Sequence, residues 1–386
     1  MRIALLCSDL GIPLGGVKGA SVHLRAVASV LLRAGHHVTA MLAAPGPESG
    51  YLPLAERGLE LRAIRLPRTV RKLEWHLAQV KPDLVLERLS LLAPEGALAA
   101  AEAGVPHVFE VNAPLDEEAS LHREFDRAAE AREAFRRGFA VSRGAVAVSE
   151  EVATWVRGLA PDGFPVRVES NGADRKFLLP PDCQLVQQLE QRLHMNGGEF
   201  RVGFVGTFRP WHDIGTLIEA ASDVSRFVPT RVILVGDGPQ RNDLLRKAWG
   251  SRAALTLTGF VPHHEIPLHL ALCDVVAVPY ASEDAYFSPL KLVEAMAAAR
   301  PVVASATGPV RRMVTDGHDG LLVPPGDRAA FAQALQRLAF EPGLRDRLGA
   351  EARRTVELHH TWDAVIGRVL QFASSLPARV EGSCRA

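Results

Sequence analysis

The chain has 386 residues, 47% of them hydrophobic, and its 44 basic side chains equal its 44 acidic ones in number. That length favours two domains or more, and the balanced charge gives no bias toward nucleic acid. Four scattered cysteines, Cys7, Cys183, Cys273 and Cys384, fit neither a disulfide framework nor a zinc site. We therefore expect a globular protein in a reducing compartment.

The N-terminal half alternates short apolar runs with helical stretches, which is typical of a parallel sheet with crossovers. The first run, RIALLCS, is too short for a signal peptide or a membrane span and is interpreted as a strand. A Gly-rich turn, a helix over residues 21–34 and a second strand at HHVTAML follow. Further strands are predicted at PDLVLE, VPHVFEV, GAVAVS and PVRVES. No later segment has the unbroken apolar length of a membrane span.

The same alternation restarts after a predicted linker around residues 178–199. Strands are expected at RVGFVGTF, RVILVG, ALTLTGF, DVVAVPY, PVVAS and GLLVPP. We predict an α/β protein with two doubly wound, Rossmann-like domains, residues 1–178 and 179–361, which face each other across a cleft. The carboxyl ends of both sheets would border that cleft, and the last helical stretch, residues 362–386, is expected to pack back on the first domain.

One acidic residue stands in the otherwise apolar helix of YFSPLKLVEAMAAARPVVAS. Ser288 is the expected N-cap, Pro289 the first helical residue, and the helix should end near Arg300, before a proline and a buried strand. Glu294 lies roughly two turns inside the helix, too far from its N-terminus to be a partner of the helix dipole. Its carboxylate therefore needs another explanation.

Two Gly-rich turns between a strand and a helix could bind phosphate groups. The first, SDLGIPLGGVKGASVHL, contains Gly15 and Gly16, and the second, FVGTFRPWHDIGTLIEA, contains Arg209 and His212. Neither is a Walker loop or a dinucleotide fingerprint, and Arg241 stands where ILVGDGPQR would need a third glycine. A structural turn with solvated side chains is the alternative for both.

Several polar residues in the N-terminal half follow or end predicted strands. Glu87 ends one strand, Glu110 and Asn112 end another, and His23 lies in the first turn of the first helix. Such residues could border a cleft, but ordinary loop starts and a partly buried histidine are the alternatives.

Taken in order, these stretches resemble glycosyltransferase family 4, retaining enzymes of the GT-B architecture. The resemblance is carried by LVGDGPQR, LTGFVPHHEIPLHLALCDVVAVPY, SPLKLVEAMAAARPVVAS and DGHDGLLVPPGD, together with GGVKGASVHLRAVASVLLRAGHHVTAM, FEVNAPL and VESNGADRKF. It implies that Glu294 accepts hydrogen bonds from the ribose hydroxyls of a nucleotide-sugar donor. The other donor contacts it implies are Gly15, Gly16, Thr207, Gly236, Phe260, Ser288, Pro289 and Leu290.

The chain departs from the family pattern at three positions. The family's second glutamate, eight positions before Glu294, is Tyr286 here. Thr207 replaces an arginine that binds the diphosphate, and His212 takes the place of a lysine. Because a neutral histidine would weaken this clamp, we expect Arg209 to compensate.

The implied function is transfer of a sugar from a UDP- or GDP-type nucleotide sugar to an acceptor hydroxyl with retention of configuration, in polysaccharide, glycolipid or other glycoconjugate biosynthesis. Arg209 and His212 would stabilise the departing diphosphate, and Glu110 is the nearest sequence candidate for a carboxylate nucleophile. His23, Glu87, Asn112 and Tyr286 are the expected contacts to the acceptor or the sugar. No metal or cofactor is then required.

Two other functions stay open: a non-catalytic nucleotide-sugar binding protein, and a nicotinamide oxidoreductase that uses the Gly-rich turns. The sequence does not name the acceptor, which could be a glycan, a lipid-linked molecule or a small molecule, and it predicts no nucleic-acid partner. Supply of activated sugars predicts a cytoplasmic location, with peripheral attachment to the inner membrane surface if the acceptor is lipid-linked.

Overall fold

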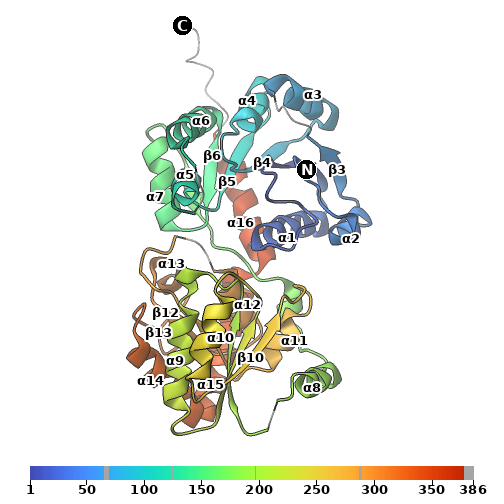
Figure 1. The fold of residues 1–386 in the computed structure, drawn as a ribbon. Coiled ribbons are helices and arrows are strands. Elements are labelled where there is room, and N and C mark those ends of the chain that lie inside the picture. The colour runs from blue at the N-terminus through green and yellow to red at the C-terminus, as the bar shows by residue number, and fades with distance from the viewer. Residues whose placement is uncertain (65–68, 123–124, 196, 287–288, 378–386) are drawn as a thin grey trace. The chain divides into compact units, whose positions relative to one another are not determined.

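The computed structural model describes residues 1–64, 69–122, 125–195, 197–286 and 289–377. It divides into two compact units, shown in Figure 1: unit 1 is Met1–Ser170 with Trp362–Ala386, and unit 2 is Asn171–Thr361. The boundary falls after Ser170, ahead of the predicted one at residue 178, and the last helix belongs to unit 1.

Unit 1 contains a sheet of seven parallel strands in the order β3-β2-β1-β4-β5-β6-β7. Its strands are β1 (Arg2–Cys7), β2 (His37–Leu42), β3 (Glu60–Ala63), β4 (Leu84–Arg88), β5 (His107–Val111), β6 (Gly144–Ala147) and β7 (Val166–Val168). The central strands are near-continuous apolar runs because helices cover both faces of a parallel sheet.

The helices of unit 1 follow the crossover pattern, with α16 added from the C-terminal end of the chain. They are α1 (Gly19–Arg33), η1 (Glu48–Gly50), α2 (Leu52–Ala55), α3 (Val70–Val80), α4 (Glu95–Glu102), α5 (Leu115–His122), α6 (Ala128–Val141), α7 (Glu150–Leu159) and α16 (Trp362–Ser375). Helix α16 packs on α1, where Arg33 pairs with Asp363 at 3.0 Å. Its Arg368 pairs at 2.7 Å with Glu169, the residue that follows β7.

Unit 2 contains six parallel strands in the order β10-β9-β8-β11-β12-β13. They are β8 (Phe200–Val205), β9 (Thr230–Val235), β10 (Ala254–Gly259), β11 (Val275–Val278), β12 (Val302–Ser305) and β13 (Leu321–Val323). Its helices are η2 (Arg175–Leu178), α8 (Cys183–Arg192), η3 (Pro210–His212), α9 (Ile214–Val224), α10 (Arg241–Trp249), α11 (Ile266–Ala271), α12 (Leu290–Ala297), α13 (Gly308–Arg311), α14 (Arg328–Phe340), α15 (Pro342–Thr355) and η4 (Val356–His360).

The core of unit 2 has two halves, one on each face of the sheet. Along β11, Val276 and Val278 belong to the cluster that contains α12, whereas Val275 and Ala277 belong to the cluster that contains α9 and α14. This alternation follows from the period of two residues in a strand. Unit 2 is therefore a three-layer arrangement of helices, sheet and helices.

The prediction of two doubly wound, Rossmann-like domains is confirmed. In each sheet the strand order reverses between the first and fourth strands, which are β1 and β4 in unit 1 and β8 and β11 in unit 2. Open α/β sheets bind ligands outside the carboxyl ends of their strands at such a point. Among the described helices, none is long and apolar enough to cross a membrane.

Candidate functional site

Glu294 lies in the interior of α12, and its side chain is 8% exposed. The helix begins at Leu290, so that Pro289 occupies the N-cap with extended backbone rather than the first helical position. Ser288, the predicted N-cap, lies outside the described residues. The helix also ends earlier than predicted, at Ala297 instead of near Arg300.

The Glu294 carboxylate is the end of a short hydrogen-bonded chain. Its Oε1 lies 2.6 Å from Nε2 of His263, and Nδ1 of His263 lies 2.8 Å from Nζ of Lys176 in η2. A lysine ammonium can only donate, so His263 accepts at Nδ1 and carries its proton at Nε2. His263 therefore donates to Glu294 and orients the carboxylate. Neither partner was predicted from the sequence.

The loop after β8 contains the predicted diphosphate residues. Thr207 and Arg209 are exposed, and the Arg209 guanidinium lies over the Trp211 ring at 5.6 Å. His212 is buried, and its Nδ1 lies 2.6 Å from the carbonyl oxygen of Thr207, which fixes the proton on Nδ1. Burial first, and then the charge of Lys291, lower the pKa of His212 to about 3. His212 is therefore neutral and does not add a cation to the loop.

A third residue that the sequence analysis did not assign is Lys291, in the first turn of α12. Its Nζ is buried without a hydrogen-bond partner among the described residues. It lies 4.4 Å from the centroid of the Phe204 ring and 6.0 Å from that of Tyr280. Burial lowers the pKa of Lys291 to about 7.

Two other predicted donor contacts of unit 2 differ in character. Gly236 has φ +133°, and a Cβ there would lie 2.1 Å from the carbonyl oxygen of Gly206. Its N–H donates to the Gly259 carbonyl, so Gly236 is required by loop packing. Phe260, by contrast, is 59% exposed after β10, which leaves its ring available for stacking on a base.

In unit 1, four polar side chains meet where β4 and β5 end. Oε1 of Glu110 lies 2.8 Å from Nε2 of His23 and 3.1 Å from Nη1 of Arg88, and it accepts a hydrogen bond from Asn112. His23 also packs edge-on against the Trp362 ring of α16 at 4.6 Å. The structure thus brings three of the predicted residues together with Arg88, the last residue of β4, and with Trp362.

Glu110 is held in its ionised form. Burial alone would raise its pKa, but the charge and hydrogen bond of His23, followed by those of Arg88 and Asn112, lower the pKa to about 2. A carboxylate so well stabilised is a weak base and a weak nucleophile. This environment suits a fixed hydrogen-bond acceptor better than the predicted nucleophile.

Three sequence-based assignments in unit 1 are not supported by the structure. Glu87 has no exposed surface and lies 2.8 Å from Nε2 of His107, so it has no access to a ligand. Gly15 is buried and its N–H donates to the Pro45 carbonyl, while the N–H of Gly16 donates to that of Pro13. These N–H groups are used within the fold and do not point to a phosphate. Glycine is required at Gly15 because a Cβ would lie 2.0 Å from the Pro47 carbonyl oxygen.

Tyr286 is half-buried in the segment between β11 and α12 of unit 2. Within the described residues, no group of three or more His, Cys, Asp and Glu side chains could hold a metal ion.

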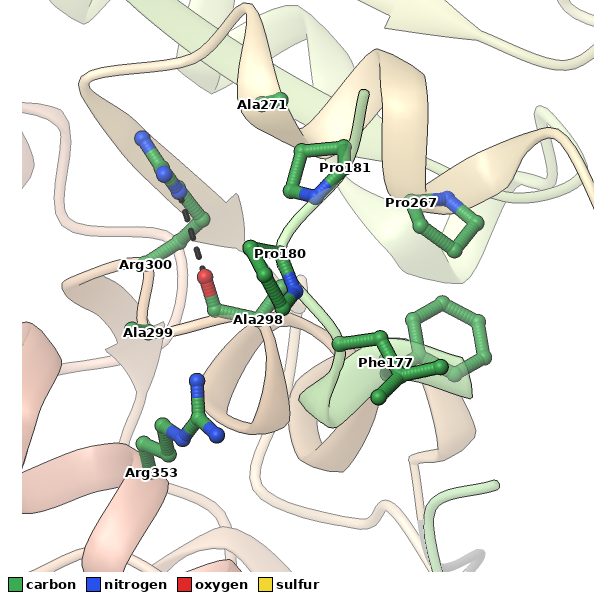
Figure 2. A pocket seen from close by; sticks show the side chains of 10 residues that line it. Phe177, Pro180, Pro181, Pro267, Ala271, Ala298, Ala299, Arg300 and Arg353 are labelled. Carbon is green, nitrogen blue, oxygen red and sulfur yellow. Dashed lines mark hydrogen bonds between the residues drawn. The ribbon is translucent and has the colours of Figure 1, made fainter. Parts of the chain in front are cut away.

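Unit 2 also contains a small pocket of 160 Å³ at the C-terminal end of α12, shown in Figure 2. Proline and alanine side chains line most of it, and the Arg300 guanidinium is bonded to the carbonyls of Ala298 and Cys273. Because Arg300 and Pro301 precede β12, the pocket lies at the amino edge of the sheet. Nucleotides bind at the opposite edge, so the pocket is interpreted as a packing gap.

Two family models cover most of the chain: "Glycosyltransferase Family 4" matches residues 17–177, and "Glycosyl transferases group 1" matches residues 199–340. The chain belongs to glycosyltransferase family 4. Solved structures agree in fold, since Anabaena HepE in complex with UDP has a TM-score of 0.77 at 20% identity and covers 97% of this chain and 100% of HepE. HepE has also been solved in complex with UDP-glucose, with a TM-score of 0.76.

Curated relatives of this family 4 chain are named as glycosyltransferases. An alpha-D-kanosaminyltransferase of Streptomyces kanamyceticus is 34% identical over 39% of this chain and 39% of its own length. A D-inositol 3-phosphate glycosyltransferase of Frankia alni is 33% identical over 56% of this chain and 52% of its own length. A 2-deoxystreptamine glucosyltransferase of S. kanamyceticus is 28% identical over 76% of this chain and 79% of its own length. The chain thus spans about half or less of the length of the first two relatives.

Proposed function

We propose that this family 4 chain transfers a sugar from a nucleotide diphosphate sugar, of UDP or GDP type, to an acceptor hydroxyl with retention of configuration. The observation that carries the proposal is the buried Glu294 carboxylate on α12, oriented by His263 next to the switch point of the unit 2 sheet. A carboxylate accepts two hydrogen bonds from adjacent hydroxyl groups, which is what a ribose offers. The UDP and UDP-glucose complexes of HepE support a nucleotide-sugar donor.

The donor would lie at the carboxyl ends of β8 to β11. Its ribose would bind to Glu294, its base would stack near the exposed Phe260 ring, and its diphosphate would reach the head of α12. Arg209 supplies an exposed guanidinium from the loop after β8. Thr207 in the same loop offers a hydroxyl group and no charge.

In the proposed step, the acceptor oxygen attacks the anomeric carbon from the face that the diphosphate leaves. The bond between that carbon and the phosphate oxygen breaks, its electron pair stays on the phosphate, and the acceptor proton passes to a phosphate oxygen. The protein contributes positive charge for the departing diphosphate. The low pKa of Glu110 argues against a double displacement through that carboxylate. No metal is assigned to the step.

A donor screen tests the proposal. Wild-type protein is incubated with UDP- and GDP-sugars, release of UDP or GDP is measured, and candidate acceptors are added. The panel includes 2-deoxystreptamine and D-inositol 3-phosphate because those names occur among the relatives. Product anomers are assigned by NMR, and a parallel reaction with EDTA tests metal dependence.

Glu294→Gln removes the charge but keeps the shape, so donor affinity should fall tenfold or more, because each hydrogen bond to a charged group contributes about 1.5–3 kcal/mol. The matched control is Glu357→Gln, an exposed glutamate of η4 in the same unit, which should leave affinity unchanged. Equal donor affinity in Glu294→Gln and wild type would remove the basis of the proposal. Donor binding without turnover for any acceptor would favour the non-catalytic binding protein. Tyr286 and Thr207, which replace functional residues of the family pattern, support that alternative.

A further inference from the structure

The amine of Lys291 is a buried cation that the proposed step leaves unused. Its nitrogen is buried and has no hydrogen-bond acceptor among the described residues. The aromatic rings of Phe204 and Tyr280 lie around it, 4.4 Å and 6.0 Å from Nζ to the ring centroids. Such rings stabilise the protonated amine weakly, but they do not replace the water that it has lost.

Burial of an unpaired amine is costly, and a methionine or leucine side chain could occupy similar space without that cost. By contrast, Arg231, another largely buried cation of unit 2, is paired within the protein and lies 2.6 Å from Glu199. The unpaired amine therefore indicates that its partner is not one of the described residues. An anion that enters the site and leaves it again would fit this requirement.

The position of the amine specifies which anion. A Cβ on Gly206, the residue that follows β8, would lie 3.2 Å from Lys291 Nζ. The amine thus borders the same loop that contains Thr207 and His212, at the β8–β11 switch point. Those two positions bind the diphosphate in the family that the sequence resembles, but here one is uncharged and the other is a neutral histidine.

We propose that Lys291 supplies the positive charge on the donor diphosphate that Thr207 and His212 do not supply. This inference rests on the proposed function, because it assumes a nucleotide diphosphate donor. The ammonium would bind phosphate oxygens in the ground state and stabilise the added charge when the bond to the anomeric carbon breaks. Lys291 comes from α12, so the charge approaches the diphosphate from the helix head instead of the β8 loop.

The first test compares ligands with and without phosphates. Lys291→Met keeps an unbranched side chain of similar length without the charge, and calorimetry is done with UDP, GDP, uridine and guanosine. Affinity for the diphosphate that binds wild type should fall tenfold or more in Lys291→Met, while affinity for the matching nucleoside stays within twofold. Lys291→Arg, which keeps the charge, should recover part of the diphosphate affinity.

The second test measures protons, a readout that a purely structural lysine would not change. Burial lowers the pKa of the free amine to about 7, so at pH 8 most amines are neutral and must take up a proton when a diphosphate binds. Calorimetry at pH 8 in buffers of different ionisation enthalpy should give uptake approaching about one proton in wild type and none in Lys291→Met. Other titratable groups near the amine are His212 from η3, Tyr280 after β11 and Glu294 one turn along α12.

Folding is checked by thermal unfolding without ligand. Because the substitution removes a buried amine, Lys291→Met should have a melting temperature equal to or above that of wild type. If wild type binds neither UDP nor GDP, the proposed function is wrong, and the assignment of Lys291, which depends on it, is wrong as well. If wild type binds a diphosphate and Lys291→Met binds it equally well, or with the same proton uptake, then the assignment of Lys291 is wrong while the proposed function stands.

Discussion

The chain from Lys176 through His263 to Glu294 allows a sharp test of how the site is held. His263→Phe keeps an aromatic ring against Phe177, whose ring centroid lies 5.4 Å away, but removes the donor that is 2.6 Å from the Glu294 carboxylate. A carboxylate that has lost its orientation would also lose a hydrogen bond from a ribose hydroxyl of the donor, and a hydrogen bond to a charged group contributes about 1.5–3 kcal/mol. The expected loss of donor affinity is therefore roughly 10- to 150-fold, with the ribose contact affected because the carboxylate is no longer oriented.

The assay is titration calorimetry with whichever of UDP and GDP binds wild type. The neighbouring residue provides a matched control, because His264 is 77% exposed and the same substitution there removes no buried contact. His264→Phe should leave affinity within twofold. Lys176→Met should have a smaller effect than His263→Phe, since it removes the second link and leaves the first in place.

A double-mutant cycle decides whether His263 acts through Glu294. If it does, His263→Phe should cost little once Glu294→Gln is already present, because the contact it supports has gone. The reasoning is refuted if His263→Phe weakens binding equally in the wild-type and Glu294→Gln backgrounds, or if it has no larger effect than His264→Phe.

Two further predictions concern stability within each unit, measured by hydrogen exchange and mass spectrometry of peptides from β5 and from β8. The Glu110 carboxylate has a pKa lowered from 4.5 to about 2, so its stabilisation is present above about pH 4.5 and is lost as the pH falls toward 2. That shift corresponds to about 3 kcal/mol, which Glu110→Gln should remove from unit 1 at neutral pH; equal protection of β5 in both proteins would contradict this. Gly236→Ala places a Cβ 2.1 Å from a carbonyl oxygen at φ +133° and should destabilise unit 2 by about 1–3 kcal/mol, whereas Gly250→Ala, whose Cβ has no neighbour closer than 3.9 Å, should not. Similar protection of β8 in the two alanine variants would show that the loop adjusts without cost.

The strands of both sheets could be predicted because parallel strands covered on two faces are short, unbroken apolar runs. The missed strand, β3, shows the limit of that signal. Its sequence ELRA is four residues long, two of them charged, and none of the four is fully buried. An edge strand of this kind has the composition of a loop, and only its pairing with β2 identifies it.

Glycines show a second limit. In the sequence, Gly15 and Gly236 occupy turns between strand and helix, where glycine serves either a bound phosphate or a close backbone contact. The structure gives both the second role, since each has a carbonyl oxygen within 2.1 Å of where its Cβ would lie. Because glycine occurs in both kinds of turn, a glycine motif alone does not distinguish a phosphate-binding turn from a turn with a close backbone contact.

The Glu294 carboxylate could be predicted because a single acid in an apolar helix is locally anomalous, whereas its partners could not. His263 and Lys176 come from other segments, 31 residues from Glu294 and 87 residues from His263, and only the packing of η2 and α12 brings them together. In the same way, the sequence places Lys291 three residues before Glu294, the spacing of an ordinary helical ion pair. In the structure Glu294 is bonded to His263 and the Lys291 amine has no partner among the described residues. Because its potential helical partner is already bonded to His263, the Lys291 amine stays available for an anion from outside the protein.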